Sequence, residues 1–268
     1  MSLTWDPAIA IALGCSAVVA TAGPLVLALV LWRRTGVSLK AWLFGALTFV
    51  VSQFVFRLPW QIPLSAWLAP KLEGNEAATF AWIAGASLTA GLFEETGRWL
   101  AYRWLWKDRS TRGGVMLGAG HGGFESIVLV GLSLIGSLVV YVALSHGVTL
   151  GIPADKLPLV EKQFSSLTPL LASLGGVERM AAWALHIGCS LLVLEGVRTQ
   201  SKKWWALSVA VHFAVNLFAV VTMKQVGPVA AEVGTVIAVT FVLFFALRRS
   251  RTGSLSPAGE RVGERACA

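Results

Sequence analysis

The chain has 268 residues, of which 56% are hydrophobic and only 13% are charged. Soluble domains carry about 25% charged residues, so this composition excludes an ordinary soluble protein and favours one polytopic membrane domain. The net charge of +8 does not indicate nucleic-acid binding, because the basic residues gather in short loops between apolar spans. The three cysteines are unpatterned, which predicts neither a disulfide framework nor a thiolate metal site.

Long apolar runs recur along the whole chain, and about 20 such residues cross a bilayer as a helix. The sequence predicts an all-α, polytopic transmembrane helical bundle with about seven spans, at residues 8–32, 40–58, 78–104, 114–145, 169–197, 204–223 and 228–247. The loop over 146–168 is expected to hold a short interfacial helix. We expect a transmembrane domain over residues 1–247 and a polar, disordered tail over 248–268.

Lysines and arginines mark one set of span ends, at residues 33–40, 103–112, 198–203 and 248–251, while the opposite ends carry few of them. Loops rich in lysine and arginine stay in the cytoplasm. The sequence therefore predicts an integral protein of the plasma (inner) membrane with its N-terminus outside and its C-terminus in the cytoplasm.

Ionisable residues also lie inside the apolar spans, namely Glu94, Glu95, His121, His186 and His212. At about 1.5 Å per helical residue, Glu95 and His186 lie roughly 18 Å from the basic span ends, and His121 and His212 roughly 13 Å. Charge at this depth costs about 2.5–3.5 kcal/mol per residue on insertion scales. One layer of such groups in the cytoplasmic half of the bilayer indicates a functional centre.

Each of these groups has a polar neighbour on its own helix face, because residues four apart share a face. The pairs are Glu94 with Arg98, His121 with Glu125, His186 with Ser190, and His212 with Asn216. We expect each span to turn its polar stripe inward. We also expect Arg98 to pair with Glu94, which would leave Glu95 freer to act as a base.

The chemistry of this set suits peptide-bond hydrolysis. A glutamate and a histidine can activate water, while a second histidine and an asparagine can donate to the oxyanion. The same residues could instead bind zinc and leave one position for water, although the HExxH stretch of many zinc proteases is absent. A transporter with a proton or metal relay is a third possibility, and an immunity factor or scaffold a fourth; no repeat of the kind many transporters show is visible.

The order of these residues over about 90–220 resembles that of a known family. The motifs are Glu94-Glu95-Thr96-Gly97-Arg98, Gly120-His121-Gly122-Gly123-Phe124-Glu125, His186, and His212-Phe213-Ala214-Val215-Asn216. They resemble the CAAX-protease and bacteriocin-processing (CPBP) superfamily, and most of all its YhfC family of intramembrane peptidases, to which PrsW-type proteases are related. The first motif departs from the usual EExxxR and is closer to the EExxK of PrsW-type proteins.

The resemblance implies a hydrolase whose cavity opens to lipid and cytoplasm and which acts on membrane-associated protein or peptide substrates. We expect a glutamic-type endopeptidase without a cofactor, because Asn216 beside His212 suits an oxyanion site and asparagine is an unusual zinc ligand. The expected catalytic residues are Glu94, Glu95, His186, His212 and Asn216, with Arg98, His121, Glu125 and Ser190 in support. In the zinc alternative, the ligands would be Glu95, His121, His186 and His212.

Overall fold

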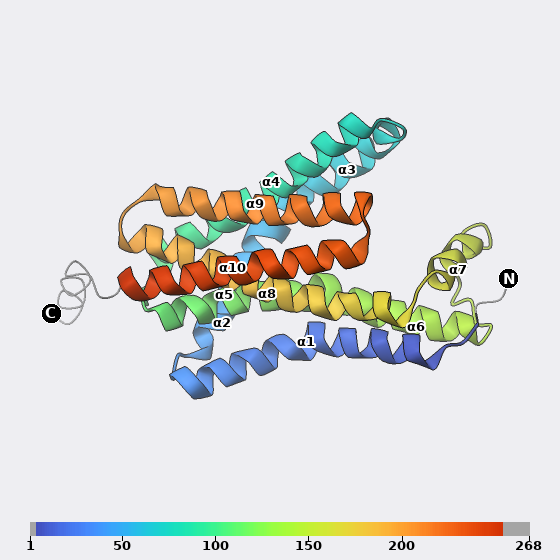
Figure 1. The fold of residues 1–268 in the computed structure, drawn as a ribbon, viewed down its shortest axis with the longest axis horizontal. Helices are drawn as coiled ribbons and strands as arrows, with labels where there is room; N and C mark the ends of the chain where they lie inside the picture. Colours follow the sequence, from blue (N-terminus) through green and yellow to red (C-terminus); the bar gives the residue numbers. More distant parts are fainter. Residues whose placement is uncertain (1–3, 254–268) are drawn as a thin grey trace.

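The computed structural model describes residues 4–253, in which all regular secondary structure is helical (Figure 1). Three of the segments are π-helical and are labelled η. In chain order the elements are α1 (Pro7–Thr35), α2 (Leu39–Val50), η1 (Val51–Arg57), α3 (Leu58–Leu72), α4 (Glu76–Leu100), η2 (Ala101–Leu105), α5 (Thr111–Glu125), η3 (Ser126–Gly131), α6 (Leu132–Ser145), α7 (Leu157–Ser165), α8 (Pro169–Arg198), α9 (Lys202–Gln225) and α10 (Pro228–Gly253).

Local sequence signals fix where several of these helices begin. Asp6 accepts a hydrogen bond from the Ala8 amide at 2.8 Å, and Pro7 follows it at the first helical position of α1. Thr168 caps α8 in the same way, again with a proline in the first turn. A side-chain acceptor satisfies an amide that the helix itself cannot satisfy, and proline suits a position whose N–H is unused. Each apolar run therefore starts at a defined residue.

Six helices in the described part of the chain are long and apolar enough to cross a membrane. They are Pro7–Thr35, Leu39–Leu72, Thr111–Ser145, Pro169–Arg198, Lys202–Gln225 and Pro228–Arg251. Helix α4 corresponds to the predicted span over 78–104 but is not among the six, and it carries Glu94, Glu95 and Arg98. The protein is therefore an integral membrane protein, and the count of about seven spans remains a prediction.

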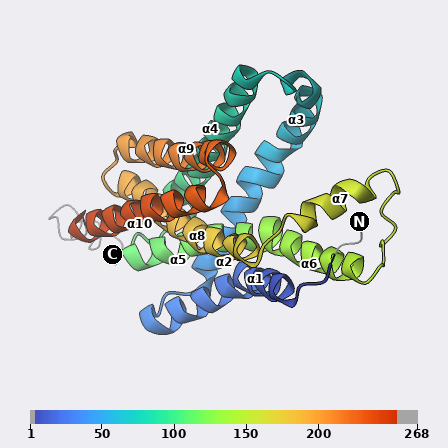
Figure 2. The ribbon, with the colours of Figure 1, turned by 45° about the vertical axis from the view of Figure 1, so that its right-hand side comes forward.

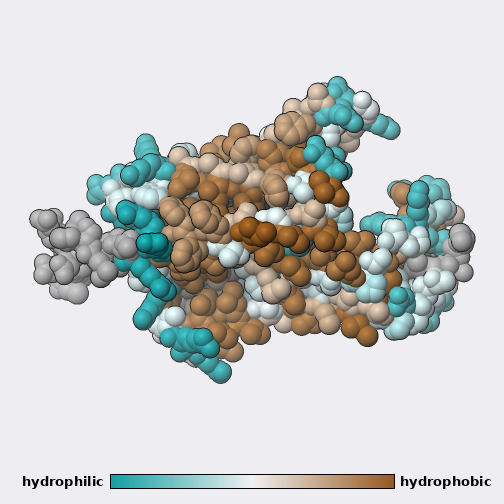
Figure 3. All heavy atoms as spheres, viewed as in Figure 1, coloured by the Kyte–Doolittle hydropathy of each residue, from teal (hydrophilic) through white to brown (hydrophobic). Residues whose placement is uncertain are grey.

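A broad apolar belt covers the face of the bundle seen in Figure 3, between two hydrophilic ends. Helix α10 contributes a stripe of exposed side chains to this surface, formed by Val233, Ile237, Phe241 and Phe244. Soluble monomeric proteins rarely expose so large an apolar surface to water. The belt is the surface that lipid covers.

Helix α8 lies at the centre of the bundle, where it packs against α1, α5, α9 and α10. Helix α9 also packs against α4, and α2 packs against α5. The α3–α4 hairpin tilts away from the long axis that the other long helices follow (Figures 1 and 2). The polar residues of α4 therefore face α8 and α9 near the middle of the molecule.

Glycines let α5 approach two neighbouring backbones. A Cβ atom on Gly120 would lie 2.0 Å from the carbonyl oxygen of Trp42 in α2, and one on Gly118 would lie 2.7 Å from the Cα of Ile187 in α8. Such small-residue contacts are a common means of packing membrane helices. They place His121, next to Gly120, within one side-chain length of α8.

The observed boundaries differ from the predicted ones in three places. Helix α10 continues through Gly253, so the expected start of the tail at residue 248 is wrong; the rest of that tail lies outside the described residues. The second apolar run continues as far as Leu72 instead of residue 58. The loop after α6 contains α7, which confirms the short helix expected there.

Candidate active site

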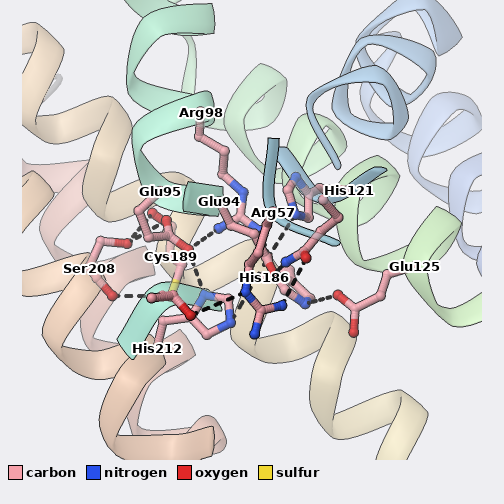
Figure 4. A network of polar contacts seen from close by, with 12 residues as sticks. Arg57, Glu94, Glu95, Arg98, His121, Glu125, His186, Cys189, Ser208 and His212 are labelled. Atoms are coloured by element: carbon pink, nitrogen blue, oxygen red, sulfur yellow. Dashed lines mark hydrogen bonds and ion pairs between the residues drawn. The ribbon is translucent and has the colours of Figure 1, made fainter. Parts of the chain in front are cut away.

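Glu94 lies at the centre of a polar network (Figure 4) whose side chains come from α2, η1, α4, α5, α8 and α9. Its Oε2 atom is 2.9 Å from His121 Nε2, 3.7 Å from His186 Nδ1 and 3.9 Å from His212 Nε2. Four residues predicted from the sequence to share a layer therefore meet around one carboxylate oxygen. All four are buried.

The second oxygen of Glu94 is held from η1. Gln53 donates its side-chain amide to Glu94 Oε1, and Arg57 donates to Gln53 Oε1 at 2.9 Å. The guanidinium of Arg57 also donates to the carbonyl oxygen of Ala86 at 2.8 Å. Gln53 and Arg57 both belong to η1, and π-helical interruptions of this kind occur frequently at functional sites.

Glu95 has a different environment, although it adjoins Glu94 in sequence. Its carboxylate accepts hydrogen bonds from Arg98, from Ser208 at 2.8 Å and from His212 Nδ1 at 2.8 Å. Its exposed fraction is 0%. Arg98 does pair with Glu94, at 3.5 Å, but the expectation that this pairing frees Glu95 is wrong because Arg98 contacts Glu95 more closely.

The hydrogen bonds define which nitrogens of two histidines carry a proton. The Thr48 hydroxyl donates to the Gly45 carbonyl at 2.6 Å, so at 2.8 Å it accepts from His121 Nδ1. In His212, Nδ1 donates to the Glu95 carboxylate. The Nε2 atoms of both rings are then left with lone pairs. These lone pairs face Glu94 Oε2, so the centre requires a cation there, either a shared proton or a metal ion.

His186 is oriented from both sides. Its Nδ1 accepts from Arg98 at 2.6 Å, and its Nε2 lies 2.7 Å from Glu125 Oε2. Glu125 therefore pairs with His186 and not with His121, its neighbour on the same helix. Ser190 does not contact His186, because its hydroxyl bonds to Tyr102 at 2.7 Å and to the Gly114 carbonyl at 2.9 Å. Glu125 and Ser190 thus lie inside the bundle, as expected for inward polar stripes, but each bonds a residue of another helical segment.

A cavity of about 680 Å³ adjoins the network. Among the residues that line it are Glu94, Glu125, His186, His212 and Asn216. Glu95 is fully buried and does not line the cavity. Of the two glutamates, Glu94 is the one that can meet water or a substrate.

The cavity continues away from the network toward a second group of charges. Arg179 lines it and pairs with Glu178 and with Glu125, the latter at 3.3 Å. Glu232 lines the same part of the cavity. A chain of ion pairs therefore connects Glu125, at the centre, with the rim.

The sequence did not point to several residues of the network: Thr48, Gln53, Arg57 and Ser208. Only Arg57 left a signal, a charge at the end of the predicted span over 40–58. Thr48, Gln53 and Ser208 are ordinary polar residues in apolar runs, and only the fold reveals that they contact the glutamates and histidines.

The donor set fits a zinc ion. Glu94, His121, Glu125 and His186 each offer one ligand atom, and these atoms all lie within 4.8 Å of one another. Nitrogen and carboxylate donors are those of catalytic zinc sites. His212 held through Nδ1 by Glu95 has the second-shell support that metal-binding histidines usually have. Compared with the zinc ligands proposed from the sequence, this set has Glu94 in place of Glu95 and Glu125 in place of His212; Glu95 and His212 form a second group of possible donors with Cys189.

A helical membrane protein with a buried glutamate–histidine centre beside a cavity is the class that this fold and site define. The chain belongs to the YhfC intramembrane metalloprotease family, whose profile matches residues 18–240. This confirms the family resemblance inferred from the motifs.

A relative from Bacillus subtilis (strain 168), described as the uncharacterized membrane protein YhfC, is 34% identical over 234 residues. The match covers 82% of this chain and 88% of that protein. No solved structure matches the chain significantly.

Proposed function

We propose that this protein is a metal-dependent intramembrane peptidase that hydrolyses peptide bonds of membrane-associated substrates in the cavity beside Glu94. The observation that carries the proposal is the convergence of three histidine nitrogens, at 2.9, 3.7 and 3.9 Å, on one glutamate oxygen at the inner end of a cavity. Ionisable groups at membrane depth usually serve a function. The family description is consistent with proteolysis.

Zinc would be held by Glu94 and His121, with His186 or His212 completing the site. When bound, it would supply Lewis acidity toward water and toward the carbonyl of the scissile bond. The residues around it have separate tasks: Glu125, beside His186, is placed to accept a proton, and Arg98 and Glu95 orient His186 and His212.

Two donors that line the cavity suit the carbonyl oxygen of a bound peptide. Asn216 follows His212 by one helical turn, and the guanidinium of Arg57 is held at Gln53 and Ala86 by neutral acceptors only. Within residues 4–253, no carboxylate lies within ion-pair distance of Arg57. Its charge is therefore available to a developing oxyanion. The role proposed for Asn216 is the one expected from the sequence, whereas His212, which offers a lone pair, is better suited to bind a cation.

A metal-independent, glutamic-type peptidase is the second candidate. The geometry at Glu94 supports this candidate too. A proton shared by Glu94 Oε2 and His121 Nε2 would fill the place between their lone pairs as well as a metal ion would. A transporter is less consistent with the structure. The residues that line the cavity stop at the glutamate–histidine network, so the cavity does not form a pore through the bundle.

The test measures cleavage and metal content together. Membranes from cells that produce the wild-type protein or Glu94→Gln are compared by mapping new peptide N-termini, and the purified proteins are analysed for metal by mass spectrometry. We expect new termini only with the wild type, together with about one zinc per chain, the stoichiometry of a single catalytic site. Cleavage by zinc-free protein would establish the glutamic type, and the absence of wild-type-dependent termini would refute the peptidase.

A further inference from the structure

The cavity occupies only one end of the bundle. On α4, its lining residues run from Trp82 to Glu94 and stop there; on α8 they run from Leu174 to His186 and stop. Helix α9 runs the other way, and its lining residues begin at His212 and continue to Met223. The glutamate–histidine centre is therefore the floor of the cavity, and the lining extends from it in a single direction.

The opposite end of the bundle is sealed directly behind the centre. Tyr102, Ser190 and the backbone of Gly114 form a hydrogen-bonded chain between η2, α8 and α5, with Tyr102 and Ser190 both at 0% exposure. Leu191 and Leu194 pack beside it and are also fully buried. No lining residue of the cavity comes from this region. A second cavity of about 680 Å³ does lie on this side, between α2–η1 and α4–η2, but it is apolar, and neither glutamate and none of the three histidines of the centre line it.

The sealed end is also the basic end. The helix termini there carry Arg33, Arg34, Lys40, Arg103, Lys107, Arg109, Arg112, Arg198, Lys202, Lys203, Arg248, Arg249 and Arg251. They form the hydrophilic cap on the side of the C-terminus in Figure 3. The cavity end carries few basic residues, and two of them, Arg57 and Arg179, line the cavity itself. Since loops rich in lysine and arginine stay in the cytoplasm, the sealed end faces the cytoplasm.

We infer that the active centre is reached from the non-cytoplasmic side of the membrane, so that its substrates are peptide segments presented in the outer half of the bilayer. This inference differs from the expectation, drawn from the family resemblance, of a cavity open to the cytoplasm. The substrate class rests on the proposed peptidase function; the direction of access does not.

The lining of the cavity suits such a substrate. At the end farthest from the centre the lining includes the apolar Trp82, Leu174 and Met223. Glu178 and Arg179, between Leu174 and His186 on α8, and Glu232 on α10 add charges to the walls. An extended peptide segment in the outer half of the bilayer has apolar side chains and a polar backbone without internal hydrogen bonds. The apolar lining residues can contact its side chains, and the charged ones can bind its backbone.

Cysteine labelling tests the direction of access without requiring activity. In a background with Cys15→Ser and Cys267→Ser, the variants Ala219→Cys, Ala214→Cys and Gln200→Cys are treated with a membrane-impermeant maleimide. Ala219 lines the cavity, whereas Ala214 lies exposed on the same helix α9 and does not line it, and Gln200 is exposed at the basic end. Each variant is labelled in intact cells and in inverted membrane vesicles.

We expect Ala219→Cys to react in intact cells, Gln200→Cys to react only in inverted vesicles, and Ala214→Cys to react in neither, because maleimide requires a thiolate in water. Adding Glu94→Gln should leave this pattern unchanged. Labelling of Ala219→Cys only in inverted vesicles, or in neither preparation, would overturn the inference. So would labelling of Gln200→Cys in intact cells.

A second measurement addresses the substrate class. Cleavage sites that depend on wild-type Glu94 should map to the outer halves or outer flanks of substrate spans. Sites on the cytoplasmic side would overturn the substrate class, even where the labelling pattern holds. If cleavage is absent but labelling is as expected, the peptidase proposal fails and the outward-facing cavity stands.

Discussion

The two halves of the polar network use the same kinds of side chain in different surroundings. On the sealed side, Glu95, Arg98 and Ser208 satisfy one another in a core that excludes water. On the cavity side, Glu94 and Asn216 border open space. Dense internal pairing of this kind fixes structure, because the charged groups of these side chains are held by one another. Reactivity requires the arrangement of the cavity side, in which some groups keep lone pairs or protons that solvent or substrate can reach.

Replacement of the cavity-side carboxylate should have the largest effect. Glu94→Gln is expected to abolish nearly all cleavage, because a neutral amide replaces the carboxylate that would bind the metal ion, while the amide keeps the shape of the side chain. Cleavage per folded molecule is the measurement, and Glu178→Gln at the rim is the control. A larger loss for Glu95→Gln, with its fold intact, would reverse the assignment of the two glutamates.

Replacement of the sealed-side cation should damage the fold instead. Arg98→Ala strands the carboxylates of Glu94 and Glu95, and breaking a buried ion pair costs about 3–5 kcal/mol. Abundance in the membrane and the midpoint of denaturation should both fall. Arg103→Ala, in an exposed position of the adjoining η2, should leave both unchanged. Normal abundance of Arg98→Ala would show that the sealed half does not depend on this charge.

Asn216 provides a test of the cavity half alone. Asn216→Ala should lower kcat by about 10²–10³, the usual effect of losing one oxyanion donor, with little change in KM, because the interaction is made in the transition state. Abundance should remain normal, since Asn216 borders the cavity and not the core. A rise in KM at constant kcat would assign Asn216 to substrate binding instead.

The smallest effect is expected for glycine packing in the sealed half. Gly118→Ala places a Cβ atom 2.7 Å from the Cα of Ile187, and overpacking of this kind costs typically about 1–3 kcal/mol. Gly85→Ala in α4 is the matched control, because nothing lies within 4 Å of its added Cβ. That substitution should stabilise the helix by up to about 1 kcal/mol. Equal effects would mean that α5 and α8 can separate freely.

The sequence predicted the apolar helices and the layer of Glu94, His121, His186 and His212, because hydropathy and helical rise are local properties. It could not predict which glutamate meets the cavity. The two side chains lie about 100° apart on α4, and only the positions of α8 and α9 decide which of them is enclosed.

The direction of the cavity was also beyond the sequence. The distance of a residue from the basic span ends gives its depth in the membrane. The depth does not show whether a cavity reaches that residue from the cytoplasmic side or from the opposite side. The sealing contact between Tyr102 and Ser190 joins residues 88 positions apart, which no local pattern reveals. The support that Gln53 and Arg57 give to Glu94 depends in turn on the π-helical geometry of η1, for which the sequence carried no visible signal.

The arrangement of charges on α4 has a consequence for how the protein is made. Arg98 pairs with Glu94 and Glu95 within one helix, so α4 can enter the bilayer with its charges already partly neutralised, at the stage when later helices are still in the ribosome. His212, which completes the centre, lies 117 residues after Glu95. The centre therefore cannot assemble until α9 has been synthesised and docked. A nascent or truncated chain that ends before α9 would therefore be inserted without a complete glutamate–histidine centre.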